Sequence, residues 1–418
     1  MIRSMTESPV QFWSSEVPAG CWSPVLKEPA ARALCTDCGL SRSERAKRCG
    51  QACQFIRPDY PRLEQQVHGR ARLPYRPDEL HFGPYQSMYQ ASLRSPLPGA
   101  QWTGITTRIA ERLLEAGEVD AVLTVTSSAE DRWQPVPVLI TEPAGLQICR
   151  GMRIGFAPLL ALLEPALARG YKRLAVIAMP CQAYPLRVLE QELGFERLDV
   201  IGTPCADNTD TPRFHEFLTF FADDPNDVTY LEFRPDHYVE LRFEGGRKQE
   251  IPFLQLPLAK LSPDFFPLTC RTCVDYTNVL ADVVIGSMGG RGEQWLIVRN
   301  ERGRHLLNLL GDELLLRPTG SAGKRTSAVT GYLRNTERAA SGLPVRRMPN
   351  WLRPIMSRLM PYMGPRGLEF ARARVEMKAG ETLIHLRQMA PERLDTMVPE
   401  HVRELAKPYA SVIDPDGS

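Results

Sequence analysis

Long hydrophobic runs and a charge imbalance are both missing from this 418-residue sequence. The longest clean apolar segments, such as residues 174–179, are far shorter than the ~18 residues that cross a bilayer. The first residues also lack the apolar core of a secretory signal peptide. The 51 Lys and Arg residues almost balance the 49 Asp and Glu residues, and the net charge of +2 argues against a nucleic-acid partner. We therefore expect a cytoplasmic protein without a transmembrane segment.

The motifs of several enzyme classes are also absent. No GxGxxG follows a predicted strand, no HExxH, GxSxG or paired-carboxylate signature occurs, and the seven histidines are scattered. Residues 319–327 (TGSAGKRTS) imitate a phosphate-binding loop, but its first glycine is missing and Arg325 stands where Ser or Thr is required. The sequence therefore supports neither hydrolysis nor a standard dinucleotide site.

Cysteine, by contrast, is plentiful, with ten residues in a chain expected in a reducing compartment. Four of them fall within 19 positions as two closely spaced pairs, which can chelate opposite sides of a metal centre. The spacing does not distinguish zinc from an iron–sulfur cluster, and unrelated thiols are the alternative. This first set consists of Cys35, Cys38, Cys49 and Cys53.

A second set surrounds the ends of predicted strands and consists of Cys181, Cys205, Cys270 and Cys273. Its first two members follow the strands expected at 174–180 and 198–204, with a helix between them. The ends of neighbouring parallel strands meet at one edge of a sheet ~4.8 Å apart, so these thiols are expected to approach one cluster. The alternative for each is a small buried apolar side chain, which is our interpretation of Cys21 and Cys149.

Strands and helices alternate along the middle of the chain, and this predicts an α/β fold with a mostly parallel sheet. Residues 228–256 change to period-two alternation around a turn at 244–246, which predicts an inserted antiparallel hairpin or meander. The expected strands are 119–126, 174–180, 198–204, 281–290 and 293–300, and the expected helices are 105–116, 157–169, 185–193 and 302–310.

Composition divides the chain into four segments. Residues 1–60 hold five of the ten cysteines and little hydrophobic periodicity, so we interpret them as a small segment ordered by metal. Seven prolines between 57 and 98 indicate an extended connector at 61–98, followed by the α/β core at 99–316. The C-terminal region, 317–418, begins with nine basic residues and one acidic residue between 317 and 358.

Within this basic stretch, residues 351–363 are amphipathic and rich in methionine. They are interpreted as a core or subunit contact, as a cover for a lipophilic molecule, or as a contact with a membrane surface.

Small and polar residues mark two further places. Residues 102–108 (WTGITTR) open a helix whose backbone N–H groups and Arg108 suit a pyrophosphate, with an ordinary threonine cap as the alternative. Asn208 and residues 275–278 lie beside the second cysteine set, where they orient a flavin, supply a proton, or act as turn residues.

Several of these motifs together resemble a flavin and iron–sulfur family. They are GAQWTGITTRIAERLLEAGEVDAV, MPCQ with TPCADNT, CRTCVDYTNVLADVVIGSMG with VRNERG, and MGPRGLEFAR. The family includes the β subunits of deazaflavin-reducing hydrogenases, the 7-hydroxymethyl chlorophyll a reductases and the ferredoxin-dependent divinyl (proto)chlorophyllide 8-vinyl reductases. The motifs CTDCGL, ACQF and GPRGLEFAR look like the chlorophyll-metabolising branch, and the resemblance extends from Cys35 to Arg374.

The resemblance implies FAD, two 4Fe–4S clusters and electrons from ferredoxin. One cluster is implied on the first cysteine set, now interpreted as an N-terminal iron–sulfur segment, and the other on the second set. Plant-like members read CxxCGLC, whereas Ser41 stands here at the third thiol, and Cys49 is expected to supply the missing ligand. The expected cofactor-binding residues are Thr103, Gly104, Thr107, Arg108, Gln182, Asn208, Thr277 and Asn278.

The implied activity is reduction of the 8-vinyl group of divinyl (proto)chlorophyllide to ethyl, in (bacterio)chlorophyll biosynthesis. The candidate proton donors are Asp275, Tyr276 and His237. The basic stretch at 317–358 would steer an acidic ferredoxin, or is simply a solvated face. The alternatives are 7-hydroxymethyl chlorophyll a reduction, a non-catalytic electron-transfer subunit, and a zinc-stapled binding protein.

Overall fold

The computed structural model describes residues 18–27, 34–234, 236–287, 294–320, 323–339, 342–343, 349–363 and 367–415. Residues 1–17, the end of the strand expected at 281–290, and Arg346 and Arg347 of the basic stretch lie outside the described residues.

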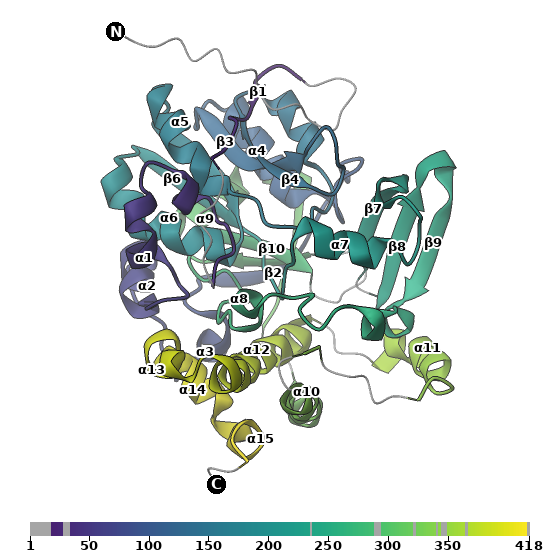
Figure 1. Cartoon of the computed structure of the whole chain (residues 1–418). Helices are drawn as coiled ribbons and strands as arrows, with labels where there is room; N and C mark the ends of the chain where they lie inside the picture. Colours follow the sequence, from purple (N-terminus) through teal and green to yellow (C-terminus); the bar gives the residue numbers. More distant parts are fainter. Residues whose placement is uncertain are drawn as a thin grey trace.

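A nine-stranded mixed sheet forms the centre of the molecule, in the order β1-β4-β3-β5-β6-β10-β11-β2-β12 (Figure 1). The four central strands, β3, β5, β6 and β10, pair in parallel, and the pairs on both flanks are antiparallel. The strands are β1 (Cys21–Trp22), β2 (Ser87–Leu93), β3 (Ala121–Ser127), β4 (Pro135–Ile140), β5 (Arg173–Ala178), β6 (Arg197–Gly202), β10 (Val283–Ser287), β11 (Gln294–Val298) and β12 (Leu314–Pro318).

Both faces of this sheet are covered, and successive residues of one strand enter different cores. Leu123 of β3 packs in the core shared with α6 (Pro180–Leu193) and α12 (Gly367–Met389). Val122 packs in the opposite core with α4 (Ile105–Glu115) and α9 (Glu301–Asn308). Because both faces are buried, the central strands are continuous apolar runs.

The smaller sheet is the inserted antiparallel unit, with β7 (Val228–Phe233), β8 (Tyr238–Phe243) and β9 (Lys248–Pro252) in sequence order. It shares a separate core with α7 (Thr211–Leu218), which includes Phe214 and Phe217. Figure 1 shows it to one side of the main sheet.

The remaining helices fill the margins. The N-terminal part contributes α1 (Cys49–Ala52), α2 (Tyr60–His68) and α3 (Glu79–Phe82), and the core adds α5 (Leu163–Ala168) and α8 (Leu268–Arg271). The C-terminal region is helical: α10 (Thr326–Arg338), α13 (Leu394–Met397), α14 (Glu400–Ala406) and α15 (Ala410–Ile413) pack around α12, whereas α11 (Arg353–Met363) lies apart from them, beside the small sheet (Figure 1).

The α/β fold, its largely parallel centre and the antiparallel insertion are confirmed. The absence of regular elements expected between 57 and 98 is wrong, because this segment holds α2, α3 and β2, and β2 lies between β11 and β12 in the sheet. Pro61 does not disrupt α2, because it lies in the first helical turn, where no backbone N–H is needed for a helical hydrogen bond. Residues 135–140 also form a strand despite Pro135 and Pro137.

Candidate functional site

The second cysteine set gathers at the carboxyl ends of β5 and β6. Cys181 lies in the first turn of α6 directly after β5, Cys205 follows β6, and Cys270 and Cys273 lie on and just after α8. Burial raises the pKa of Cys205 well above its ordinary value, and the neighbouring Cys270, Cys181 and Cys273 raise it further. Thiolates this close repel one another unless a cation lies between them, so the four side chains fit a metal cluster. That they hold one stays a prediction.

The first cysteine set lies beside the second. Burial raises the pKa of Cys38 well above its ordinary value, a backbone hydrogen bond from Leu40 opposes this, and the neighbouring thiols of Cys181, Cys53 and Cys49 raise it further. Cys38 therefore lies near members of both sets. The chain around it is fixed, because the N–H of Leu160 donates to the Cys38 carbonyl at 2.9 Å.

Gly39 makes this approach possible. Its φ of 103° is in the left-handed region, and a Cβ there would lie 2.4 Å from the carbonyl oxygen of Pro158. Any side chain at position 39 would push the Cys38 loop away from the core.

Polar groups point at the thiols of both sets. The N–H of Asp37 donates to Cys35 Sγ at 3.3 Å, and Gln54 Nε2 donates to Cys273 Sγ at 3.6 Å. Hydrogen bonds to cysteine sulfur are a feature by which proteins tune iron–sulfur clusters.

Among the described residues, which include all eight cysteines of the two sets, no group of three His, Cys, Asp or Glu side chains is placed to hold a single metal ion. A tetrahedral zinc site surrounds one ion with its ligands, whereas a polynuclear cluster spreads them around several metal atoms.

A buried charge network joins the C-terminal helix α12 to the second cysteine set. Lys378 Nζ donates to the Cys270 carbonyl at 2.7 Å and to Asp207 Oδ1 at 2.8 Å, and lies 3.3 Å from Glu381. Arg374 reaches the same Asp207 at 3.4 Å. This contribution of α12 was not predicted from the sequence. The available signal was the i, i+4, i+7 spacing of Arg374, Lys378 and Glu381 along one helix face.

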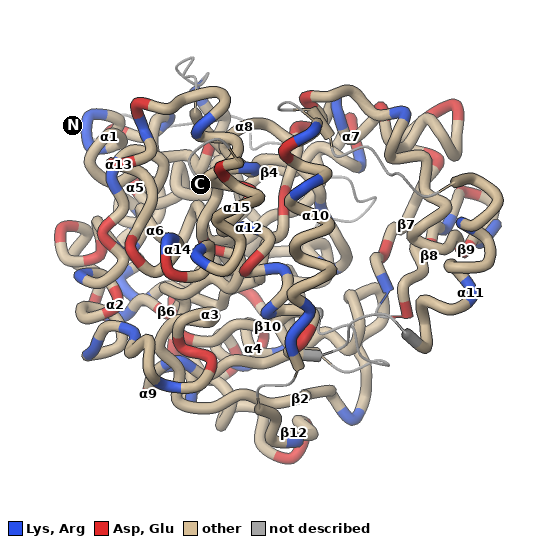
Figure 2. Tube along the Cα trace, turned by 90° about the horizontal axis from the view of Figure 1, so that it is seen from below, with Lys and Arg blue, Asp and Glu red and all other residues tan. Residues whose placement is uncertain are grey.

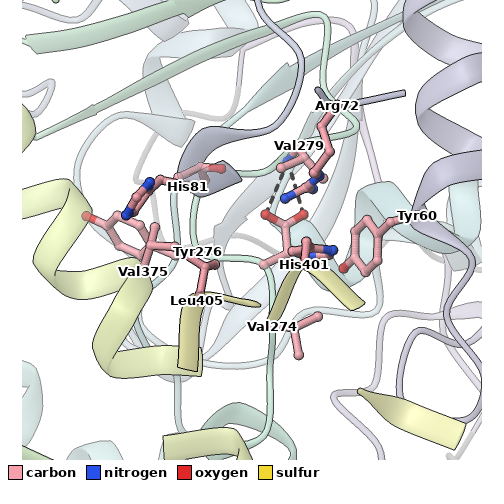
Figure 3. Close-up of a pocket in the computed structure, with 11 residues that line it drawn as sticks. Tyr60, Arg72, His81, Val274, Tyr276, Val279, Val375, His401 and Leu405 are labelled. Carbon is pink, nitrogen blue, oxygen red and sulfur yellow. Dashed lines mark hydrogen bonds between the residues drawn. The ribbon is translucent and has the colours of Figure 1, made fainter. Parts of the chain in front are cut away.

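A small pocket lies where the 274–279 loop meets α2, α3, α12 and α14 (Figure 3). Tyr60 of α2 and His401 of α14 lie side by side there, edge to face, with ring centroids 5.7 Å apart. Burial lowers the pKa of His401 well below its ordinary value and Arg72 lowers it further, so the imidazole is neutral. The pocket thus combines a neutral imidazole with the charged Arg72, beside the loop that follows Cys273.

Two of the three candidate proton donors, Asp275 and Tyr276, line this pocket. Burial raises the pKa of Asp275 to about 6, although Arg299 and the Val279 N–H, which donates at 3.0 Å, favour its anion. Burial raises the pKa of Tyr276 to about 12. His237 lies elsewhere, in the turn before β8, and is not among the pocket residues.

The residues predicted to bind a cofactor near α4 have protein partners. Thr103 Oγ1 accepts from the Leu93 N–H and donates to Gln294, which ties β2 to β11. Arg108 pairs with Glu111 at 2.9 Å. Gly104 precedes α4 with a φ of 88°, and Thr107 lies half-buried in the first turn.

The predicted cofactor residues near the cysteines also bridge backbone segments. Gln182 caps α6 and donates to the Ala157 carbonyl, and Asn208 exchanges hydrogen bonds with Gly155. Thr277 accepts from Arg299 through its carbonyl, and Asn278 donates to the Ala178 carbonyl at the end of β5. They hold the cysteine loops in place, and a direct cofactor contact stays a prediction for each.

The start of α4 carries two buried donors without hydrogen-bond partners within the described part of the chain. Gln101 Nε2 and Trp102 Nε1 are buried, and neither has a hydrogen-bond partner among the described residues. Buried donors are normally satisfied, so this end of α4 fits a bound polar group such as FAD.

Cys21 and Cys149 pack in the opposite core, with α4 and α9. Burial raises their pKa values to about 11 and about 12, so both are thiols at neutral pH. Their placement agrees with the interpretation as buried apolar side chains.

Within the described part of the chain, no helix combines the length and the apolar character needed to span a membrane.

Comparison with known proteins identifies two family domains. Residues 88–164 match the N-terminal domain, and residues 171–318 the C-terminal domain, of the coenzyme F420 hydrogenase/dehydrogenase β subunit. The boundary between them lies just before β5.

Two similar sequences cover nearly the whole chain. An uncharacterised protein of Nostoc sp. is 36% identical over 387 residues, which is 92% of this chain and 96% of that protein. The chloroplastic 7-hydroxymethyl chlorophyll a reductase of Oryza sativa subsp. japonica is 35% identical over 401 residues, 93% of this chain and 84% of that protein.

Among solved structures, the F420-reducing [NiFe] hydrogenase complex of Methanosarcina barkeri contains a chain with the same fold. The TM-score is 0.57 at 17% identity, covering 78% of this chain and 98% of that chain.

Proposed function

The chain belongs to the coenzyme F420 hydrogenase/dehydrogenase β-subunit family, and we propose that it is an oxidoreductase that reduces the 8-vinyl group of divinyl (proto)chlorophyllide to ethyl with electrons from ferredoxin. The observation that carries this proposal is the gathering of two cysteine sets beside each other in a chain 35% identical to a chlorophyll reductase.

The proposed cofactors are FAD and two 4Fe–4S clusters, which when bound supply transfer of one and two electrons. The first cysteine set would hold one cluster and the second set the other. The FAD would lie near the start of α4, where Gln101 and Trp102 keep unsatisfied donors.

The protein's own groups would orient the pigment and supply protons. Conversion of vinyl to ethyl consumes two electrons and two protons. Asp275 and Tyr276 are the proposed donors, because they share one pocket beside Cys273 and are buried from bulk water. The basic residues of 317–358 would steer ferredoxin, since complementary charge mainly accelerates encounter.

The second candidate is reduction of the 7-hydroxymethyl group to methyl, which uses the same electrons and protons and releases water. The rice relative favours it by its name and its 35% identity.

The test is an anaerobic assay of protein that carries full flavin and eight iron atoms. Reduced ferredoxin is supplied with divinyl chlorophyllide or with 7-hydroxymethyl chlorophyll a, and the pigments are separated by chromatography. We expect monovinyl product from the first substrate only. Turnover of the second substrate alone would replace the proposal by the second candidate, and turnover of neither by an iron-loaded protein would favour a non-catalytic electron-transfer subunit.

A further inference from the structure

The outward face of α11 is apolar, the reverse of what an ordinary surface helix presents. Of the large hydrophobic side chains exposed among the described residues, four lie on α11 or the turn before it. Trp351 is 71% exposed, Ile355 50%, Leu359 40% and Tyr362 76%. Their spacing of i, i+4, i+8 and i+11 places them on a single stripe. Such an exposed apolar stripe is typical of a surface that binds another protein or a membrane.

The side of α11 opposite the stripe faces the protein and carries Ser357 together with the half-buried Met356 and Met360. Ser357, on the opposite side from the stripe, is 3% exposed, and its hydroxyl donates to the Arg353 carbonyl at 2.7 Å. The helix packs against residues Phe253–Gln255 at the end of β9, and Phe253 adds a 36%-exposed ring beside it. Figures 1 and 2 both place α11 at the periphery, beside the small sheet. The stripe is therefore presented outward by an anchored helix.

The sequence that surrounds the stripe carries charge of one sign. Between residues 338 and 368 the sequence has no Asp or Glu but has six arginines: Arg338, Arg346, Arg347, Arg353, Arg358 and Arg366. Arg358 is exposed on the stripe side of α11, and no carboxylate of the described residues lies within ion-pair distance of it. On the neighbouring β9, Glu250 is already paired with Arg234 and Lys248.

We propose that α11 docks the protein on an anionic lipid surface. An apolar stripe with a tryptophan and a tyrosine near its ends and arginine beside it is the pattern of a helix that lies in the membrane interface. A second copy of this chain fits less well, because a symmetric contact through this stripe would bring like arginines together. An acidic soluble protein would engage the arginines but leave the four apolar side chains in water.

The test is vesicle flotation of the full-length holoprotein without pigment or ferredoxin, so its outcome is independent of the proposed reaction. We expect binding to phosphatidylcholine vesicles that contain phosphatidylglycerol, and little binding to phosphatidylcholine alone. Binding should weaken as salt is raised. Arg358→Gln should weaken it by about fivefold, the value of one interfacial charge.

Two further variants distinguish membrane binding through the apolar stripe from non-specific adsorption to the vesicles. Ile355→Gln with Leu359→Gln should weaken vesicle binding by at least about tenfold while flavin and iron content stay unchanged. Tyr75→Ser, at an 81%-exposed ring far along the chain, is the matched control and should leave binding unchanged.

Failure of the wild type to float with anionic vesicles would overturn the proposal. Equal binding to neutral and anionic vesicles, or equal loss in the control, would overturn it as well. A change of oligomeric state by light scattering in Ile355→Gln/Leu359→Gln, without vesicle binding by the wild type, would assign the stripe to a contact between copies.

Discussion

Lys378 shows how one side chain, distant in sequence, completes the candidate site. Its ammonium group lies within hydrogen-bond distance of the Cys270 carbonyl and Asp207, and its side chain is 2% exposed. A buried cation is stable only with such partners, so Lys378 fixes the loop of Cys205 relative to that of Cys270. It also places positive charge next to the proposed cluster, where it would favour the more negative, reduced state.

Lys378→Met is therefore expected to lower the reduction potential of the second cluster. We expect a shift on the order of 60 mV, a tenfold change in a one-electron equilibrium, measured by potentiometric titration followed by EPR. Lys378→Arg should recover part of the shift, and Lys324→Met, at an exposed lysine, should cause none. An unchanged potential in a folded Lys378→Met protein with full iron would show that the lysine acts only on the loops.

Asp282 connects secondary-structure elements in the way that Lys378 connects the cysteine loops. Its carboxylate accepts from Arg187 of α6 at 2.8 Å, from the Val200 N–H of β6 at 2.7 Å, and from Asn300 and Arg302 at the start of α9 at 2.8 and 2.9 Å. One buried carboxylate at the start of β10 thus joins β6 to two helices. Burial opposes its ionisation, but Arg187 and Arg302 prevail and lower its pKa.

Asp282→Asn should lower the free energy of unfolding by roughly 3–5 kcal/mol, because Arg187 loses its fully buried counter-charge and keeps only the partly exposed Glu190. The lowered pKa makes this contribution fully present above the ordinary aspartate range and lost as the pH falls through the folded-state value. Denaturant unfolding at neutral pH and at successively lower pH measures the free energy of unfolding of both proteins. The difference between variant and wild type should shrink as the pH falls. Asp395→Asn, at a 98%-exposed side chain, should match wild type throughout. If Asp282→Asn lowered the free energy of unfolding at neutral pH no more than Asp395→Asn does, the role of Asp282 would be contradicted.

A strand or helix can be predicted from the sequence where its hydrophobic pattern is set by neighbouring residues, and not where it is set by distant ones. The strands that became β3, β5 and β6 were predictable because both of their faces are buried and short helices separate them. The segment 57–98 was not, because β2 is defined by its pairing with β11 and β12, which are more than two hundred residues away. In α12, buried charges interrupt the apolar pattern, and their partners lie on distant loops. The cysteine sets were predictable from spacing and strand order, whereas their adjacency depended on the fold.

At the scale of the whole molecule, both cysteine sets lie on one side of the main sheet. Cys49 belongs to the core that contains α6 and α12, and Cys38, Cys53, Cys181 and Cys273 pack against it. Cys21 and Cys149 lie in the other core. The C-terminal helices close over the same side, so the proposed electron path and the pocket of Asp275 share one half of the molecule.

This adjacency has a magnetic consequence. Because Cys38 neighbours Cys181, the two proposed clusters would lie close together, and magnetic coupling between paramagnetic centres rises steeply at short range. The EPR spectrum of the fully reduced protein should therefore show spin–spin splitting. Cys49→Ser should remove the first cluster, lower the iron content by about half and leave an unsplit signal from the second. Cys149→Ser, at a thiol buried in the opposite core, should keep the iron content and the splitting, and an unsplit spectrum from wild-type protein with eight iron atoms would contradict the proposed arrangement.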